Sequence, residues 1–398
     1  MSVFANLCLV NFLARFSYAL ARNPVLPLFA LTLGAGPEAV GWAVGVSTVT
    51  GICFKLPSGA LSDVIGRRRA MLAGLVFFGL MPYAYLFIDS YAALIAVRFV
   101  HGLATAIYAP VAMAVVASLA GERKGELLSL FSSVAIIGTL LGAPIGGLIL
   151  HNPFTVGEPG LTLFRLVYLI SGLTGTAALV LGLRSLGFGE DAPSGTGQNL
   201  AERGRLFVRG LREVAGDGRV LAASSMEAVQ NLAMGALEAF LPIYAVTVAG
   251  LTEFEAGLLW GAQVMVIMAA KPLMGRVSDR RGRRPLIAIG MALCAVPLAA
   301  VPHLAGFWSL LVACLAFGLG EALVTSSSAA LVADVSRSRH LGSAMGVFGT
   351  IADVGHAAGP ILAGVLVGGF GYGPGFAALA VVLIAAIPWY VRVAARQG

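Results

Sequence analysis

The chain has 398 residues, of which 58% are hydrophobic and only 11% are charged. Because a soluble domain carries about 25% charged residues, this composition excludes an ordinary soluble protein and predicts an all-α membrane protein. A net charge of +7 would suggest nucleic-acid binding in a soluble chain, but here we expect the basic residues to mark one side of a bilayer, with no nucleic-acid partner.

Apolar runs near the length of about 20 residues that a spanning helix needs recur along the whole chain. We predict twelve transmembrane helices, at roughly 4–34, 38–60, 69–88, 91–119, 126–150, 162–183, 220–249, 254–274, 285–303, 306–333, 341–368 and 374–392. The longest polar stretch separates the first six from the last six. The expected parts are therefore an N-terminal six-helix half (1–183), a cytoplasmic linker (184–219) and a C-terminal six-helix half (220–398).

The linker contains a second pattern. After a segment rich in Gly, Ser and Pro, the apolar residues return at helical spacing among arginines, at Leu206, Phe207, Leu211 and Val214. This predicts a basic amphipathic helix that lies on the membrane surface.

Lysine and arginine are distributed unevenly between the loops. They occur in the loops after even-numbered spans and at the C-terminus, whereas the loops after odd-numbered spans carry none. Because basic loops remain on the cytoplasmic side, we expect a multi-pass protein of the cytoplasmic (inner) membrane, with both termini and the linker in the cytoplasm.

One charged segment occurs twice. Residues 59–69 read GALSDVIGRRR, and in the second half of the chain residues 275–284 read GRVSDRRGRR. We call these two segments the repeated motif. Asp63 corresponds to Asp279 and Gly66 to Gly282 at one constant offset, and the two halves of the chain are therefore copies of one unit.

Three patterns in the chain resemble motifs of the major facilitator superfamily. The repeated motif resembles the family's loop between its second and third spans. The fourth span carries Arg98 and Gly102, spaced as Arg-x-x-x-Gly. The fifth span carries the glycine and proline pattern at Gly138, Gly142, Pro144, Gly146 and Gly147, with a partial copy at Gly355, Gly359, Pro360 and Gly364.

This resemblance implies two pseudo-symmetric six-helix halves that transport by alternating access. The fifth-span pattern is associated, in that family, with drug:proton antiporters, and this implies efflux. One feature departs from many proton-coupled members: the first span carries Arg15 and Arg22 where those members have a carboxylate.

The resemblance implies that the repeated motif acts as a conformational latch, formed by Gly59, Asp63, Gly66, Arg67, Gly275, Asp279, Gly282 and Arg283. Asp63 is predicted to follow the end of a helix, and Gly66 to allow a tight turn. The carboxylate can then accept hydrogen bonds at a neighbouring helix N-terminus or pair with an arginine. The alternative is that these residues only fix topology.

Small residues four positions apart let helices pack closely, and an internal proline favours a bend. Gly138, Gly142 and Pro144, with Gly359 and Pro360, are therefore expected to bend and pack the fifth and eleventh spans. Resemblance places this bend beside the transport path, and generic packing is the alternative.

Two polar stripes correspond between the halves. Asn11, Arg15, Tyr18 and Arg22 share one face of the first span, and Glu227, Asn231, Met234 and Glu238, at the corresponding positions of the repeat, share one face of the seventh. Because a charge at bilayer depth costs at least about 2.5 kcal/mol, both stripes are expected to line a cavity. The alternative is that Arg22 and Glu238 pair as an outer gate.

Further ionisable residues lie inside predicted spans: Arg98, His101, Glu321, Asp353 and His356. We expect one of the acids to carry a coupling proton, with Glu321 and Asp353 the first candidates and Glu227 the next. The alternatives are buried ion pairs for the acids and hydrogen-bonded packing for the two histidines.

The preferred function is proton-coupled efflux of small amphipathic compounds by a monomer. One alternative is a specific transporter of an organic anion or zwitterion, in which the first-span arginines clamp a carboxylate or phosphate. Another is a membrane sensor or assembly factor on the same fold. We expect no enzyme activity, no metal and no cofactor beyond a coupling ion, since no catalytic set or metal-ligand spacing is present and the four cysteines occur singly in apolar runs.

Overall fold

The computed structural model describes residues 3–119, 123–151, 160–185, 205, 218–336 and 341–395. The predicted amphipathic helix of the linker lies outside these residues. The chain divides into two compact units. Unit 1 comprises Met1–Ala35, Val46–Leu200 and Thr252–Gly261, and unit 2 comprises Gly36–Gly45, Ala201–Leu251 and Ala262–Gly398.

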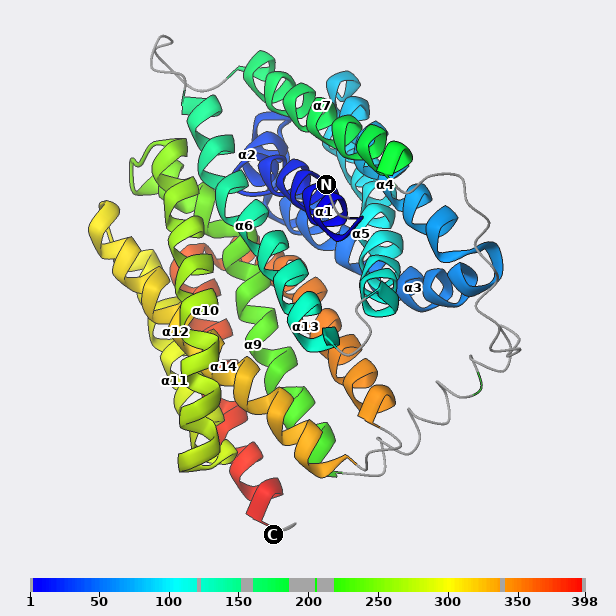
Figure 1. The fold of residues 1–398 in the computed structure, drawn as a ribbon. Coiled ribbons are helices and arrows are strands. Elements are labelled where there is room, and N and C mark those ends of the chain that lie inside the picture. The colour runs from blue at the N-terminus through cyan, green and yellow to red at the C-terminus, as the bar shows by residue number, and fades with distance from the viewer. Residues whose placement is uncertain are drawn as a thin grey trace. The chain divides into compact units, whose positions relative to one another are not determined.

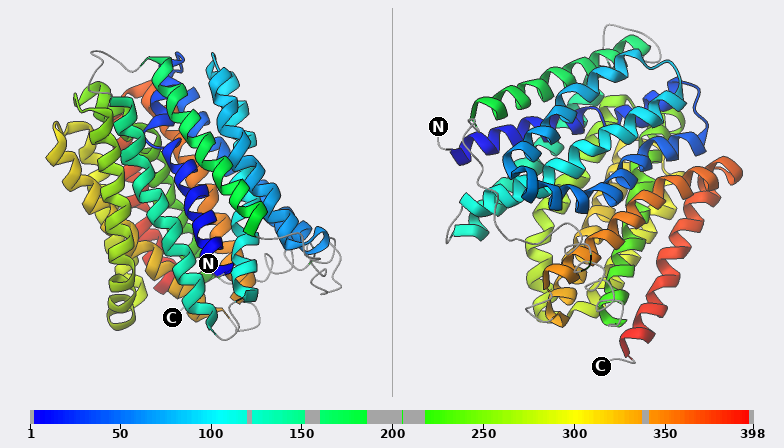
Figure 2. Two further views of the ribbon diagram at one scale, coloured as in Figure 1. Left: turned by 45° about the horizontal axis from the view of Figure 1, so that its top comes forward. Right: turned by 90° about the vertical axis from the view of Figure 1, so that its right-hand side faces the viewer.

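The regular elements of the described residues are all helices, as the composition predicted, and Figures 1 and 2 show them. The helices of the first half are α1 (Val3–Leu20), α2 (Val25–Thr32), α3 (Pro37–Ile65), α4 (Arg67–Ala84), α5 (Tyr91–Leu119), α6 (Lys124–His151) and α7 (Leu161–Ser185). Those of the second half are α9 (Gly218–Ile243), α10 (Glu253–Arg281), α11 (Arg283–Ala300), α12 (Phe307–Val335), α13 (Leu341–Phe370) and α14 (Tyr372–Ala395).

Eleven helical stretches of the described residues are long and apolar enough to cross a membrane. The first of them, Val3–Thr32, contains both α1 and α2. The remaining predicted span, the second (38–60), corresponds to α3, a helix of 29 residues. The fold is therefore an all-α membrane fold of twelve spans in two pseudo-symmetric halves, as predicted.

The first span differs from its prediction as one continuous helix. It is interrupted between Leu20 and Val25, next to Pro24. A proline has no backbone N–H to continue the helical hydrogen bonds. Its counterpart in the second half is Phe240, and α9 continues through this position without a break.

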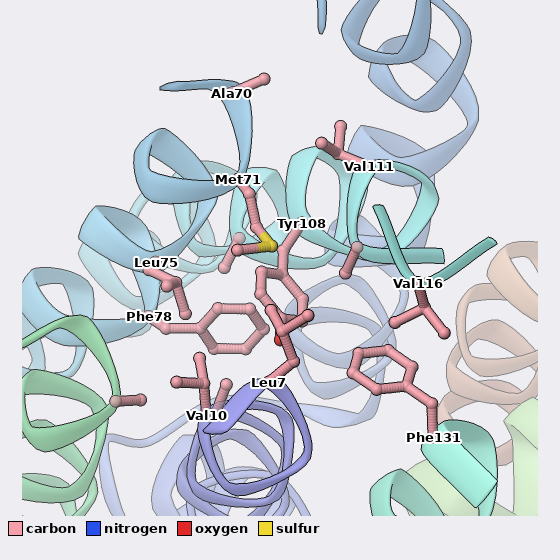
Figure 3. Close-up of a cluster of buried hydrophobic side chains, with 14 of the residues drawn as sticks. Leu7, Val10, Ala70, Met71, Leu75, Phe78, Tyr108, Val111, Val116 and Phe131 are labelled. Carbon is pink, nitrogen blue, oxygen red and sulfur yellow. The ribbon is translucent and has the colours of Figure 1, made fainter. Parts of the chain in front are cut away.

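Within unit 1, α1 packs against α4, α6 and α7. A buried apolar cluster joins α1 to α4, α5 and α6, and Figure 3 shows Tyr108 at its centre, beside Phe78. The two rings meet edge to face with 5.6 Å between their centroids. Since such contacts add to the benefit of burial, this cluster holds α1 in a fixed position.

Within unit 2, α9 takes the place that α1 has in unit 1. It packs along α13 and contacts α11, α12 and α14. A smaller apolar cluster joins α9, α12 and α13 around Val220, Val332 and Phe348. Each unit therefore places the helix that carries a polar stripe against its neighbours of the same half.

Candidate functional site

The residues of the polar stripe on α1 differ in their burial and in their contacts. The buried Asn11 donates a hydrogen bond from Nδ2 to the carbonyl oxygen of Phe131 at 2.9 Å, and so joins α1 to α6. Arg15 and Arg22 are half-buried. The Nε atom of Arg15 is buried without a hydrogen-bond partner among the described residues, whereas the guanidinium of Arg22 lies 5.7 Å from the centroid of the Tyr18 ring.

Arg98 of α5 contacts the same tyrosine. It is 1% exposed, and its guanidinium lies 4.9 Å from the centroid of the Tyr18 ring. Such a cation–π contact stabilises a desolvated guanidinium. The Tyr85 ring lies beside it and is stacked on Tyr168 at 4.2 Å between centroids.

His101 completes this aromatic group. Its Nδ1 lies 3.1 Å from the Tyr85 hydroxyl, and its ring meets the Tyr18 ring edge to face at 5.1 Å. The structure therefore brings together Tyr18, Arg98 and His101, which the sequence selected, and adds Tyr85 and Tyr168. We call these five residues, with Arg15 and Tyr108, the cationic cluster.

The stripe of α9 has the opposite charge. Glu227 and Glu238 are 4% and 2% exposed, and Asn231 donates from Nδ2 to the Glu227 side chain at 3.3 Å. Met234 accepts a contact at its sulfur from Nε2 of Gln263 at 3.2 Å. Both charged residues of this stripe are thus buried in the protein.

Glu238 has a partner that the sequence did not single out as such. Its Oε2 lies 3.1 Å from Nε2 of His356 on α13. The sequence had offered Arg22 as an alternative partner and a packing role for His356. The spacing of residues within α9 or within α13 does not show which side chains of the two helices meet.

Glu227 belongs to a second group of polar residues, the acidic cluster, which consists of Glu227, Gln230, Gln263, Lys271, Glu321 and Thr325. These residues come from α9, α10 and α12. Glu227 and Glu321 interact with Lys271, Thr325 and Gln263, electrostatically or through side-chain hydrogen bonds, and Gln230 joins them through Cys294 of α11, which is near both acids. Glu227 and Glu321 each retain one buried carboxylate oxygen without a hydrogen-bond partner among the described residues. Both acids are near the single ammonium group of Lys271.

Several members of the two clusters were missed from the sequence. Gln230 and Gln263 are almost fully buried, and Tyr85 and Tyr108 are 1% exposed or less. Uncharged side chains give no charge signal, although a glutamine inside an apolar run is itself unusual and could have been noted. Asp353, selected from the sequence, is half-buried on α13, one turn from His356.

The repeated motif lies mostly inside helices, which corrects the prediction that Asp63 follows a helix end. α3 continues to Ile65 and α10 to Arg281, so that only Gly66 and Gly282 separate them from the next helices. These two glycines have φ angles of 97° and 87°. Side chains with a Cβ atom rarely adopt such angles, and the turn therefore depends on glycine.

The second copy of the motif forms a small ion network. Arg283 pairs with Asp279, one turn earlier, and donates from Nε to Oδ2 of Asp334 on α12 at 3.0 Å. Asp334 was not selected from the sequence. Its counterpart in the first half is Ser118, so the acid occurs in only one half and the comparison of the two halves gave no signal.

Alanine should affect stability differently at the turn glycine Gly282, which has a positive φ angle, and at the helical glycine Gly275. Gly282→Ala forces a strained backbone angle, at a cost of about 1–3 kcal/mol, and we expect it to lower the thermal unfolding temperature of the purified protein. Gly275→Ala in the same motif is the control, because a Cβ there meets nothing within 4 Å. Equal unfolding temperatures for both variants would contradict the assigned turn geometry.

The glycine and proline patterns produce very close helix contacts within each unit. A Cβ on Gly142 would lie 2.7 Å from Cβ of Ala19, and one on Gly359 would lie 2.1 Å from the carbonyl oxygen of Leu232. α6 therefore packs on α1, and α13 on α9, through backbone surfaces. Pro144 and Pro360 both lie inside these helices.

The first turns of another helix pack against each of these two prolines. Gly41 of α3 lies against Pro360 in unit 2, and Gly257 of α10 lies against Pro144 in unit 1. The internal repeat relates the two glycines to each other and the two prolines to each other, so the two contacts are pseudo-symmetric copies. Through them, the beginning of α3 belongs to unit 2 and the beginning of α10 to unit 1.

Comparisons with known proteins agree on one family. The family model described as Major Facilitator Superfamily matches residues 7–270 and 250–397. The putative multidrug resistance protein MdtD of Serratia proteamaculans is 24% identical over 390 residues, covering 88% of this chain and 82% of that protein. The multidrug transporter MdfA of Yersinia pestis is 26% identical over 328 residues, covering 79% and 76%.

Solved structures show the same fold at lower identity. The nucleoside transporter NupG superposes with a TM-score of 0.83 at 11% identity and covers 99% of both chains. A D-xylose–proton symporter superposes with a TM-score of 0.75 at 16% identity, covering 98% of this chain and 96% of that one. At these identities the likeness concerns the fold alone.

Proposed function

Because this chain belongs to the major facilitator superfamily, we propose that it exports small amphipathic compounds in exchange for protons, by alternating access. Family membership makes the chain a membrane transporter of small molecules and not an enzyme.

Efflux is supported by two kinds of observation. Relatives that match most of the chain include proteins described as multidrug transporters or multidrug resistance proteins. The fifth span of this chain also carries the glycine and proline pattern that resembles drug:proton antiporters. A transporter with this direction would work in the cytoplasmic membrane, as a monomer, with both termini and the linker in the cytoplasm.

The observation that carries proton coupling is the acidic cluster of unit 2. Glu227 and Glu321 are two carboxylates beside one ammonium group, with His356 also near Glu321, and each acid has a buried oxygen without a hydrogen-bond partner among the described residues. An ionised carboxylate at bilayer depth is costly, and binding of a proton removes that cost. The cluster can therefore take up and release a coupling proton.

The surrounding residues fit this uptake and release of a proton. Asn231 donates to the Glu227 carboxylate, and the Gln263 amide lies near Glu321, so each acid keeps a hydrogen-bond donor when it is ionised. Met234, which contacts Gln263, adds an adaptable apolar surface. We assign the coupling proton to Glu227 and Glu321 and place Asp353 after them, because it belongs to neither cluster.

The test uses purified full-length protein in liposomes that contain a pH-sensitive dye. We expect a proton gradient and an amphipathic test compound to produce substrate-dependent proton flux, and Glu227→Gln or Glu321→Gln to reduce it at least about 100-fold, as removal of an essential proton-transfer group does. Asp89→Asn is the control, because Asp89 is exposed and pairs with Arg165 at the helix ends.

Two results would contradict this proposal. One is unchanged proton flux in the Glu227→Gln/Glu321→Gln double variant. The other is substrate movement by the wild-type protein that is independent of the proton gradient across a panel of cationic, zwitterionic, neutral and anionic compounds.

A further inference from the structure

We infer that the cationic cluster of unit 1 binds the anionic group of an organic substrate, either a carboxylate or a phosphate ester. The inference rests on the transport activity proposed above and specifies the substrate class. Its basis is the charge, burial and hydrogen bonding of the residues within unit 1.

The first observation is an imbalance of charge. The sequences of α1, α4, α5 and α7 contain no aspartate or glutamate, and the only acid of α6 is Glu126 in its first turn. Glu126 is exposed and pairs with Arg123. The other described acids of unit 1 lie near helix ends: Asp63 in the last turn of α3, Asp89 paired with Arg165, Glu253 at 3.6 Å from His151, and Glu255, which accepts a hydrogen bond from Thr252. Arg15 and Arg98 therefore have no carboxylate on α1, α4, α5 or α7.

The second observation is burial without full hydrogen bonding. Arg98 is 1% exposed, and its Nε and Nη2 atoms have no hydrogen-bond partner among the described residues. The same holds for Nε of Arg15, Nε2 of His101 and the hydroxyl of Tyr108. Since a buried donor without an acceptor costs about 1–3 kcal/mol, an acceptor with several oxygen atoms would stabilise the N–H groups of the two arginines and the hydroxyl of Tyr108.

The third observation is the chemistry of the donors. A guanidinium presents a planar set of N–H groups that matches the oxygens of a carboxylate or phosphate. Arg15 shares its surroundings with Tyr18 and Tyr108, and Arg98 lies over Tyr18, so one aromatic group connects the two arginines. The rings of Tyr85 and Tyr168 add an apolar wall beside Arg98. The cluster thus offers cationic donors next to aromatic surface, which suits an amphipathic anion.

Binding to the purified full-length protein in detergent micelles, without a proton gradient, tests this inference. The probes are 4-phenylbutyrate, 4-phenylbutyl phosphate, 4-phenylbutylamine and 4-phenylbutanol, which share one apolar body. We expect the two anions to raise the thermal unfolding temperature and to bind in calorimetry, and the amine and the alcohol to bind at least about 10-fold more weakly, since each 1.4 kcal/mol corresponds to tenfold.

Substitutions locate the site. Arg15→Gln should weaken binding of the anions at least about 10-fold, and Arg15→Lys should weaken it less, because it keeps the charge but loses the planar donor set. Arg165→Gln is the matched control, since Arg165 is an arginine of the same unit that already pairs with Asp89 at 2.7 Å. If Arg98→Gln folds, its binding of the anions gives a second test of the site. If it does not fold, the Arg15 variants alone test the inference.

Three outcomes would overturn the inference. These are equal binding of the amine and the anions, equal anion binding by the wild-type protein and Arg15→Gln, and full stabilisation by chloride or inorganic phosphate with no added effect of the organic anions. The last outcome would assign the cluster to an inorganic counter-ion. Proton flux with non-anionic compounds, without anion binding, would remove only this inference, whereas anion binding without any proton flux would remove only proton exchange.

Discussion

Alanine in place of Gly355 is expected to lower the free energy of unfolding by about 3 kcal/mol or more, the upper end of the cost of overpacking. A Cβ at this position would lie 2.0 Å from the carbonyl oxygen of Ala228 and 2.6 Å from its carbonyl carbon. Both atoms belong to the backbone of α9, which cannot move away as a flexible side chain can. The two helices would have to separate along their contact.

Gly349→Ala is the matched control for this change. Gly349 lies on the same helix, α13, and a Cβ there meets nothing within 4 Å. Since alanine favours a helix over glycine by about 1 kcal/mol, this control should keep or raise the unfolding temperature. Thermal unfolding of both variants in the same detergent measures the difference, and a similar unfolding temperature for Gly355→Ala and Gly349→Ala would contradict the packing of α13 on α9.

Removal of the Glu238 carboxylate is expected to lower the free energy of unfolding about as much as Gly355→Ala. Glu238 is 2% exposed, and its carboxylate lies 3.1 Å from Nε2 of the half-buried His356. Loss of one partner of a buried pair costs about 3–5 kcal/mol, because the other polar group is left without compensation. We therefore expect Glu238→Leu to lower the unfolding temperature strongly, and Glu238→Gln, which retains hydrogen-bonding capacity, to lower it less.

A double-mutant cycle separates the pair from other effects of these residues. If the contact is responsible, Glu238→Leu combined with His356→Leu should be less destabilised than the sum of the two single variants, since residues in contact are not additive. Additive losses of unfolding free energy would show that the two side chains act independently. Thermal or denaturant unfolding of the four proteins supplies the measurement.

The extents of the helices show which features were predictable. The fourth predicted span, 91–119, corresponds in full to α5, because a segment that crosses a bilayer must satisfy its own backbone hydrogen bonds, which a continuous helix does. The predicted end of the eighth span at 274 was wrong, since α10 continues to Arg281. Charged residues at the membrane surface tolerate a helix as well as a loop, and hydropathy does not distinguish the two.

The candidate site was predictable only in part. Charged residues in apolar runs directed attention to Arg15, Arg98, Glu227 and Glu321, because a bilayer makes such charges expensive. Their uncharged neighbours, such as Tyr85 and Gln263, carry no comparable cost and became visible only when α5, α10 and α12 were placed. The pairing of Glu238 with His356 likewise depends on how α13 lies along α9.

The sequence by itself determined the membrane class, the number of spans, the internal repeat and the opposite charges of the first and seventh spans. These properties follow from composition and from periodicity along a single chain, which the bilayer and the helix constrain directly. Only the tertiary structure decided which side chains meet, how closely glycine backbones approach, and that the first turns of α3 belong to unit 2 and those of α10 to unit 1. Contacts between helices depend on their rotation and depth, which residues distant in the sequence set together and which no local pattern encodes.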